Sequence, residues 1–233
     1  IQVGDIEASN RYVRNKIKDC EEVGMMCDLL KFDEQITTEK LQDTIYDVQQ
    51  EYDGVMIQLP LPKHIDLEIL NSIKGSKDVD GLTKNTKFNP CTPYGIIELL
   101  KRSDIEISGK ECVIIGRSNI VGKPMSMLML RENATVTVAH SRTKNLKEVA
   151  KRADILIVAI GKPQFINSEY VKEGAVVIDV GIHRDENNKL CGDVDYEDVF
   201  PHASAITPVP GGVGPMTIAM LMKNCVDSVE INA

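Results

Sequence analysis

The stretch Glu111–Pro124, ECVIIGRSNIVGKP, constrains the fold more than any other part of this chain. It predicts a buried strand over 112–115, a turn opened by Gly116, and a helix entered through Gly122 and Pro124. A helix start of this kind offers free N–H groups and a positive dipole end to a phosphate. The spacing G-x5-G differs from the dinucleotide fingerprint G-x-G-x-x-G, so the pattern also fits a glycine turn without a ligand.

From this stretch onward the chain alternates between short apolar runs and helical segments. Such βα alternation predicts a parallel sheet with right-handed crossovers. The predicted strands lie at 112–115, 135–139, 154–159, 175–180 and 204–207.

The first half of the chain also contains helical periodicity and one apolar run. Gly54–Leu59, GVMIQL, predicts a strand covered on both faces, which the following Pro-rich segment ends. Ser9 and Thr92 are the expected N-caps of two helices, because each precedes an apolar-periodic segment. The predicted helices cover 9–24, a segment from about 38, and then 67–73, 92–100 and 216–229.

The composition is typical of a soluble globular protein. Hydrophobic residues make up 42% and charged residues 27% of 233 residues, and no apolar run approaches the roughly 20 residues of a membrane span. The net charge of −8 argues against a nucleic-acid partner. The six cysteines form no C-x-x-C pair and no zinc spacing, so we expect no metal site and reduced thiols in a reducing, cytoplasmic compartment. Because the chain opens on IQVGD, which is typical of a strand end, its targeting is left open.

The residues after the second strand of the predicted sheet indicate the cofactor. An NAD enzyme usually has Asp or Glu there to bind the ribose 2′-hydroxyl. This chain has His140, Ser141 and Arg142 instead, and it has Arg117 beside the first glycine. Cationic and hydroxyl groups suit a 2′-phosphate, so NADP is favoured over NAD. The alternative is that both arginines are solvated loop charges.

Four polar residues in the first half could carry chemistry. Tyr12 and Lys16 are four apart and share a helical face, Gln58 lies at the end of the apolar run, and Asp80 lies in the polar loop KDVDG. Each has an ordinary structural explanation, such as a solvated lysine or a turn aspartate. Their positions fit the carboxyl ends of strands, where open α/β sheets bind ligands. The sequence alone does not bring the four together.

A third candidate is the loop ITPVPGGVGPMT, at 206–217. Its prolines and glycines predict a defined, backbone-rich surface after the last strand, where it could reach the reactive end of a cofactor. A purely structural loop is the alternative.

Distinctive stretches occur along nearly the whole chain, namely YVRNKIK, VMIQLPLP, KDVDG, PCTPYG, GRSNIVGKP, HSRT, VIDVGI, GDV and TPVPGGVGPMT. In these stretches and in their order, the chain resembles the bifunctional methylenetetrahydrofolate dehydrogenase/cyclohydrolase family. The resemblance implies NADP-dependent oxidation of 5,10-methylenetetrahydrofolate to the methenyl form and hydrolysis to 10-formyltetrahydrofolate, within one-carbon metabolism and purine biosynthesis. It also implies a homodimer with no membrane or nucleic-acid partner.

The fold implied by the resemblance is a two-domain α/β fold with a cleft between the domains. A Rossmann-like parallel-sheet domain at 93–216 would bind NADP, and an α/β substrate domain would comprise 1–92 and 217–233. By resemblance, the catalytic residues are Lys16, Tyr12 and Gln58: Lys16 is the main catalytic group for hydrolysis, Gln58 tunes it by hydrogen bonding, and Tyr12 packs along the folate. Asp80 would bind the polar edge of the pterin. The substrate-binding residues would be Tyr12, Gln58, Leu59, Pro60, Asp80, Pro210 and Gly211. The cofactor-binding residues would be Gly116, Arg117, Ser118, Ile120, His140, Ser141, Arg142, Gly211, Gly212 and Gly214.

Two features depart from the family pattern. The chain begins without the first strand and helix expected in the substrate domain, and the link LTKNTKFNPCTP is shorter than usual. Three alternatives stay open: a dehydrogenase that has lost hydrolysis, a non-catalytic NADP-binding regulator, and an NADP dehydrogenase for a carbocyclic acid.

Overall fold

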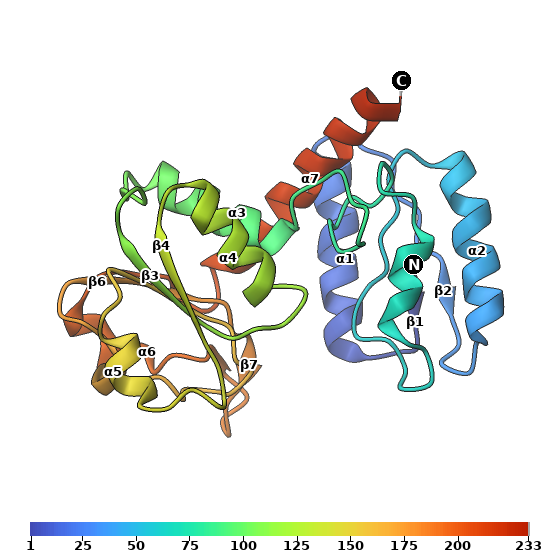
Figure 1. The fold of residues 1–233 in the computed structure, drawn as a ribbon. Coiled ribbons are helices and arrows are strands. Elements are labelled where there is room, and N and C mark those ends of the chain that lie inside the picture. Colours follow the sequence, from blue (N-terminus) through green and yellow to red (C-terminus); the bar gives the residue numbers. More distant parts are fainter. Residues whose placement is uncertain (233) are drawn as a thin grey trace. The chain divides into compact units, whose positions relative to one another are not determined.

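A computed structural model of the chain describes residues 1–232, apart from the side chains of Ala8 and Arg11. The chain divides into two units (Figure 1): unit 1 comprises 1–91 and 220–233, and unit 2 comprises 92–219. The sequence predicted borders at 92/93 and 216/217. Helix α7 (Val213–Asn232) begins in unit 2 and ends in unit 1.

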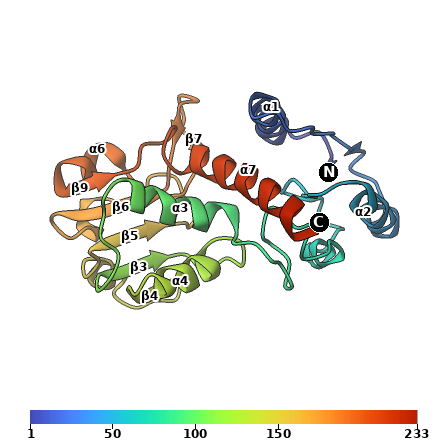
Figure 2. The same ribbon diagram turned by 90° about the horizontal axis from the view of Figure 1, so that it is seen from above.

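Unit 2 is built on a five-stranded parallel sheet with the order β4-β3-β5-β6-β9, whose strands lie side by side in Figure 2. The five predicted strands are confirmed, with each end within one residue of its expected place. Their bounds are β3 Glu111–Ile115, β4 Thr135–Ala139, β5 Ile155–Val158, β6 Ala175–Asp179 and β9 Ala203–Ile206. Since β4 and β5 lie on opposite sides of β3, the strand order reverses there, and open α/β sheets bind ligands at such a point.

Alternate strand residues pack against helices on the two faces of this sheet. Ile114 belongs to a cluster that contains residues of α3 (Cys91–Arg102) and α4 (Gly122–Arg131). Val113 belongs to the other cluster, which contains residues of the short helices on the opposite face. Continuous apolar strands therefore reflect burial on both faces. The remaining elements of unit 2 are α5 Leu146–Ala150, η2 Ser168–Tyr170, β7 His183–Arg184, β8 Leu190–Cys191, α6 Tyr196–Val199 and η3 Phe200–His202.

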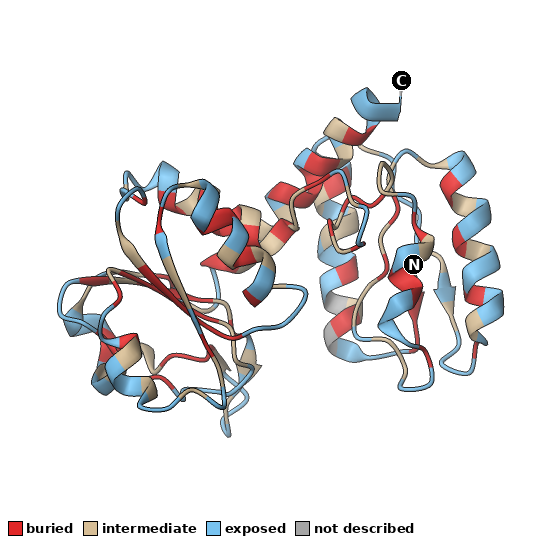
Figure 3. Cartoon of the chain, viewed as in Figure 1, coloured by how far each residue is buried: buried red, intermediate tan, exposed pale blue. Residues whose placement is uncertain are grey.

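Unit 1 encloses a separate core, shown by its buried segments in Figure 3. Helix α2 carries two fully buried residues, Leu41 and Ile45, one turn apart, and the Thr37 hydroxyl accepts a hydrogen bond from the Lys40 amide at its start. Strands β1 and β2 pair in parallel. The elements are β1 Gln2–Val3, α1 Glu7–Glu22, β2 Lys31–Phe32, α2 Thr38–Glu51, the 3-10 helix η1 Leu67–Ser72, and the end of α7.

Several local predictions were wrong. The run 54–59 is not a strand but an extended segment with one bridge, between Val55 and Asp78. Ser9 lies inside α1 rather than at its N-cap, and the N-cap of that helix is Ile6, which has no side-chain bond. Thr92 lies inside α3, where its hydroxyl hydrogen-bonds with that of Thr217 (3.0 Å).

Two helix starts also differ from the prediction. Helix α7 begins at Val213, three residues before the predicted start. The last residues of the glycine-rich loop already belong to the helix, although their glycine and proline indicated a loop. Pro124 is the third residue of α4 rather than the first, but its missing N–H still falls in the first turn, where no intrahelical partner is lost.

The packing of the central sheet yields a stability prediction. Ile157→Ala should lower the free energy of unfolding by about 2–5 kcal/mol, because the fully buried side chain leaves a cavity that the sheet cannot close. Val138→Ala, on the edge strand β4 of the same sheet and 38% exposed, is the control and should cost less than about 1 kcal/mol. Urea unfolding followed by circular dichroism measures both. Equal losses for the two variants would contradict this account of the core.

Candidate active site

Lys16 and Gln58 form a direct contact inside unit 1. Lys16 Nζ donates to Gln58 Oε1 at 3.0 Å and lies 3.6 Å from Met56 Sδ. The amide of Gln58 is fixed from its other end, since its Nε2 donates to the Leu59 carbonyl at 2.8 Å. The extended segment 54–59 thus presents an oriented acceptor to a half-buried lysine.

Asp80 joins this pair through the loop KDVDG, in which the two aspartates have different roles. Asp78 is buried and ties the loop, because its carboxylate accepts from the amides of Gly81 (3.1 Å) and Thr83 (2.8 Å). Asp80 lies close enough to Lys16 for a significant charge interaction. Alternation of side chains along the loop therefore turns one carboxylate toward the backbone and the other toward the lysine.

Burial changes the proton affinity of both groups. Burial lowers the pKa of Lys16 below its usual value, and the negative charge of Asp80 acts in the opposite direction. Burial likewise raises the pKa of the Asp80 carboxyl, with the Lys16 charge opposing it. Both shifts favour the neutral forms, as expected when desolvation exceeds the attraction of a pair. A lysine of this kind can exchange a proton nearer neutral pH than a solvated one.

Tyr12 lies one turn before Lys16 on α1 and is 37% exposed. Its aromatic ring therefore lies on the same helical face as the lysine. Leu59 and Pro60 follow Gln58 directly, and the peptide bond between them is cis. The structure thus brings Lys16, Gln58 and Asp80 together, with Tyr12 beside them.

Two residues that the sequence did not single out brace this site. Asn224, buried on α7, donates through Nδ2 to the carbonyls of Val79 (2.9 Å) and Asn89 (3.1 Å). The Cys91 thiol donates to the same Val79 carbonyl at 3.3 Å. An asparagine on an otherwise apolar helix face was the one available signal, and only the fold shows what it binds.

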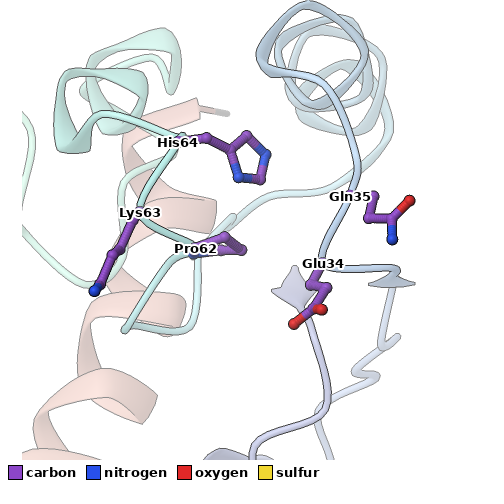
Figure 4. Close-up of a pocket in the computed structure, with 5 residues that line it drawn as sticks. All are labelled: Glu34, Gln35, Pro62, Lys63 and His64. Atoms are coloured by element: carbon purple, nitrogen blue, oxygen red, sulfur yellow. The ribbon is translucent and has the colours of Figure 1, made fainter.

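A hollow elsewhere in unit 1 contains none of the predicted residues. Figure 4 shows its lining side chains, which come from the segment before α2 and from the segment after Pro60. His64 Nε2 lies 3.0 Å from the Ile36 carbonyl, so one ring nitrogen is already engaged. The lining residues are Glu34, Gln35, Pro62, Lys63 and His64.

In unit 2 the predicted nucleotide turn has the close backbone packing that its glycines indicated. Gly116 has φ +134°, and a Cβ there would meet the Ala159 carbonyl oxygen at 2.2 Å. A Cβ on Gly122 would meet the Gly116 oxygen at 2.3 Å. The Ser118 hydroxyl accepts from the Val121 amide at 3.1 Å, at the start of α4. Both glycines are therefore required by sterics, with Arg117 and Ile120 exposed beside them.

The residues after β4 form a turn on the neighbouring strand end. The His140 amide donates to Thr143 Oγ1 (2.9 Å), and the Arg142 amide donates to His140 Nδ1 (3.2 Å). Ser141 and Arg142 are exposed. Since β3 and β4 pair in parallel, Arg117 and Arg142 both follow carboxyl strand ends on one rim of the sheet. Hydroxyl and guanidinium groups on this rim can bind a phosphate.

The glycine-rich loop begins at the opposite edge of the sheet, after β9. Thr207 Oγ1 accepts from the Asp179 amide at 2.8 Å, which anchors the start of the loop to β6. Val213 packs in the same cluster as Ile114, so the loop returns over the sheet. Its other predicted site residues, all within unit 2, are Pro210, Gly211, Gly212 and Gly214.

The part of the chain that the structure describes contains no helix long and apolar enough to cross a membrane. Nor do its described His, Cys, Asp and Glu side chains gather into a group of three or more able to hold a metal ion. All six cysteines are free.

Comparison with known proteins identifies both units. The family model described as "Tetrahydrofolate dehydrogenase/cyclohydrolase, catalytic domain" matches residues 1–80, and the model for its NAD(P)-binding domain matches residues 90–233. The bifunctional protein FolD of Agathobacter rectalis is 59% identical over 242 residues, which span 99% of this chain and 87% of that protein.

Solved structures agree with this result. The FolD methylenetetrahydrofolate dehydrogenase/cyclohydrolase of Campylobacter jejuni has a TM-score of 0.96 and 46% identity, covering 100% of this chain and 87% of that one. The dehydrogenase–cyclohydrolase of Trypanosoma brucei, complexed with NADP cofactor and inhibitor, has a TM-score of 0.92 and 36% identity, covering 99% and 85%.

The electrostatics of Lys16 can be measured directly. We expect its ammonium to titrate below the value of about 10.4 of a free lysine, and Asp80→Asn to lower it further by removing a nearby negative charge. Carbon-13 NMR of reductively methylated protein measures this, with the resonance assigned by its loss in Lys16→Arg. Because the unfolded chain binds this proton more tightly, stability should rise with pH from the folded-state pKa toward about 10.4. A rise in the pKa on Asp80→Asn would contradict the proposed pairing.

Proposed function

The chain belongs to the tetrahydrofolate dehydrogenase/cyclohydrolase family, and from this premise we propose that it carries out both reactions of the family's name with NADP as the oxidant. It would oxidise 5,10-methylenetetrahydrofolate to the 5,10-methenyl form and hydrolyse that product to 10-formyltetrahydrofolate. The observation that carries the proposal is the Lys16–Gln58 contact beside Asp80, because a second, hydrolytic step needs a group of this kind.

The dehydrogenase step requires little acid–base chemistry from protein side chains. Hydride leaves a carbon flanked by two nitrogens, so the substrate itself stabilises the resulting cation. Alignment of nicotinamide and folate therefore contributes more than a protein base does. The rigid turn at Gly116 and the glycine-rich loop at 207–214 are the parts of unit 2 suited to that alignment.

Hydrolysis needs proton transfer, because water adds to the methenyl carbon and a ring nitrogen then leaves. Lys16 serves this role only when partly neutral, which its burial promotes. Gln58 holds Nζ in place through its oriented carbonyl oxygen, and the cationic substrate would lower the pKa further. Asp80 would bind the polar edge of the pterin, and Tyr12 would pack along it.

NADP is favoured by the rim of the sheet in unit 2. Arg117 and Arg142, with Ser141, provide cationic and hydroxyl groups where an acidic residue would select NAD. The complex of the Trypanosoma brucei relative with NADP supports the same cofactor.

The proposal also covers the compartment, the assembly and the pathway of the enzyme. Six free thiols fit a reducing compartment, which we propose is the cytoplasm. Assembly as a homodimer and supply of 10-formyltetrahydrofolate to purine biosynthesis rest on the family resemblance. Size-exclusion chromatography with light scattering tests the dimer, and a monomeric mass at micromolar concentration would exclude it.

The alternatives predict different time courses with methylenetetrahydrofolate and NADP. The bifunctional enzyme forms NADPH, and the methenyl absorbance then decays. A dehydrogenase without hydrolysis forms NADPH with a lasting methenyl band. A non-catalytic NADP-binding regulator reduces no nucleotide. The retained Lys16–Gln58 contact favours the first.

Replacement of the lysine should separate the two activities. Lys16→Met should lower the hydrolysis of methenyltetrahydrofolate about 10²- to 10⁴-fold, because proton transfer is lost, while NADPH formation falls much less. Lys18→Met, exposed on the same helix, is the matched control and should keep both rates. Hydrolysis at a normal rate in Lys16→Met would refute the role of this lysine.

Replacement of the rim arginine should alter cofactor choice. Arg142→Ala should raise KM for NADP about 10- to 100-fold and leave KM for NAD unchanged, because only NADP carries the 2′-phosphate. Lys144→Ala, exposed two residues further along, is the control. Steady-state kinetics with both nucleotides measures the effect, and an equal change for NADP and NAD would argue against 2′-phosphate binding.

A further inference from the structure

Two motifs, VIDVGI and GDV, have no part in the proposed chemistry, yet each contains a buried aspartate. Asp179 ends β6 and is 3% exposed, and Asp193 follows β8 and is 0% exposed. A buried carboxylate is costly unless it is fully hydrogen-bonded. The hydrogen-bond partners of the Asp179 and Asp193 carboxylates therefore indicate the role of these two residues.

Asp193 gathers one loop around its carboxylate. The amides of Ile160 (2.7 Å) and Gly161 (3.1 Å) donate to its Oδ2, and the amide of Lys162 donates to its Oδ1 at 2.8 Å. His183 Nε2 lies 2.8 Å from Oδ1 and must donate there, since an ionised carboxylate only accepts. Three consecutive N–H groups thus converge on one side chain.

Asp179 connects Asp193 to a second loop. Its carboxylate accepts from the amides of Asp193 (2.9 Å), Val194 (3.0 Å) and Gly181 (2.9 Å). Its own amide donates to Thr207 Oγ1, at the start of the glycine-rich loop. The Asp193 carboxylate holds the loop after β5, the Asp179 carboxylate holds the backbone at Asp193 and Val194, and the Asp179 amide connects this network to the start of the loop after β9.

The glycines of both motifs make room for these carboxylates. A Cβ on Gly192 would lie 1.8 Å from Asp179 Oδ2, and a Cβ on Gly181 would lie 2.5 Å from the Asp193 carboxyl carbon. The glycines of VIDVGI and GDV are therefore required, because the aspartate side chains occupy the space that a Cβ would fill.

The loop held by Asp193 lies at the strand-order reversal, where a ligand is expected. The loop begins at Ala159, directly after β5, and the carbonyl of Ala159 packs against the nucleotide turn at Gly116. The Ala159 amide donates to the Ile115 carbonyl at 2.8 Å, which joins the loop to the end of β3. The loop itself includes Gly161 with φ +70°, a conformation that other residues rarely adopt.

We propose that Asp193 is a positioning residue for the dinucleotide: by binding the amides of 160–162 it fixes the rim of the sheet beside the Gly116 turn, and Asp179 extends this control to the loop at 207–214. The inference rests on the proposed function, in that it places the cofactor on this rim. Asp193 is fully buried and acts on the cofactor through the backbone of residues 160–162.

Asp193→Asn is the test, because it keeps the shape of the side chain but replaces one accepting oxygen with an NH₂ group that faces N–H donors. KM for NADP and the dissociation constant of NADPH, measured by its fluorescence, should rise about 10- to 100-fold. Hydrolysis of methenyltetrahydrofolate without nucleotide should stay within about twofold, since its residues lie in unit 1.

Asp154→Asn is the matched control in the same sheet. Asp154 also accepts a backbone N–H, from Glu111 at 2.9 Å, and pairs with Lys172 at 2.6 Å, but it precedes β5 at the amino edge of the sheet. This variant should leave NADPH affinity unchanged even where it lowers the melting temperature. The comparison separates a positioning role from a general loss of stability.

His183→Ala provides a milder second variant, since it removes one partner of Oδ1 and keeps the three amide bonds. It should raise KM for NADP about 3- to 10-fold, and it decides the question if Asp193→Asn does not fold. Wild-type NADPH affinity in the folded variants, or an equal loss in Asp154→Asn, would overturn the proposal. A wild-type protein that reduces no nucleotide would instead overturn the proposed function, while NADPH binding still tests the role of Asp193.

Discussion

The pairing of β3 with a parallel neighbour on each side is the constraint on which unit 2 depends. This central strand pairs with β4 over 111–115 and with β5 over 112–115, and its side chains from Cys112 to Ile115 are buried. Because β4 and β5 lie on opposite sides of β3, the strand order reverses at β3, and open α/β sheets bind ligands beyond the carboxyl ends of the strands at such a point. The nucleotide turn fits there because Gly116 and Gly122 carry no Cβ.

The candidate site in unit 1 depends on a different feature, the burial of polar side chains that interact with one another. Lys16, Gln58 and Asp80 lose water, and each gains partners that only partly replace it. Such groups are poor contributors to stability and good ones to chemistry, since a desolvated lysine exchanges its proton more readily. The bracing of the 79–91 loop by Asn224 keeps Asp80 in place without adding charge.

The same principle appears in both units, at Asp78 in one and at Asp193 in the other. Each carboxylate accepts backbone amides of a loop and so converts an irregular segment into a fixed one. In each case the carboxylate holds backbone beside a feature of the proposed chemistry, which is Asp80 in unit 1 and the Gly116 turn in unit 2. Loops positioned in this way can carry function on a rigid scaffold.

Sequence patterns determined the strands of unit 2 and its helix-and-turn order, because continuous apolar runs and glycine turns are local signals. They also singled out Lys16, Gln58 and Asp80 individually. The strand predicted at 54–59 is instead an extended segment that bonds to the backbone at Ile1 and Lys77, since apolar character alone does not tell how far a partner strand runs alongside.

Only the tertiary structure decided which of these residues meet. Lys16 and Gln58 are 42 positions apart, and Asp179 reaches the amides of Asp193 and Val194 through the excursion of β7 and β8. No local pattern encodes such contacts, because hydrogen bonding across long separations depends on where the whole backbone runs. The residue types, and hence the available chemistry, were written in the sequence; the burial that shifts their proton affinities came from the fold.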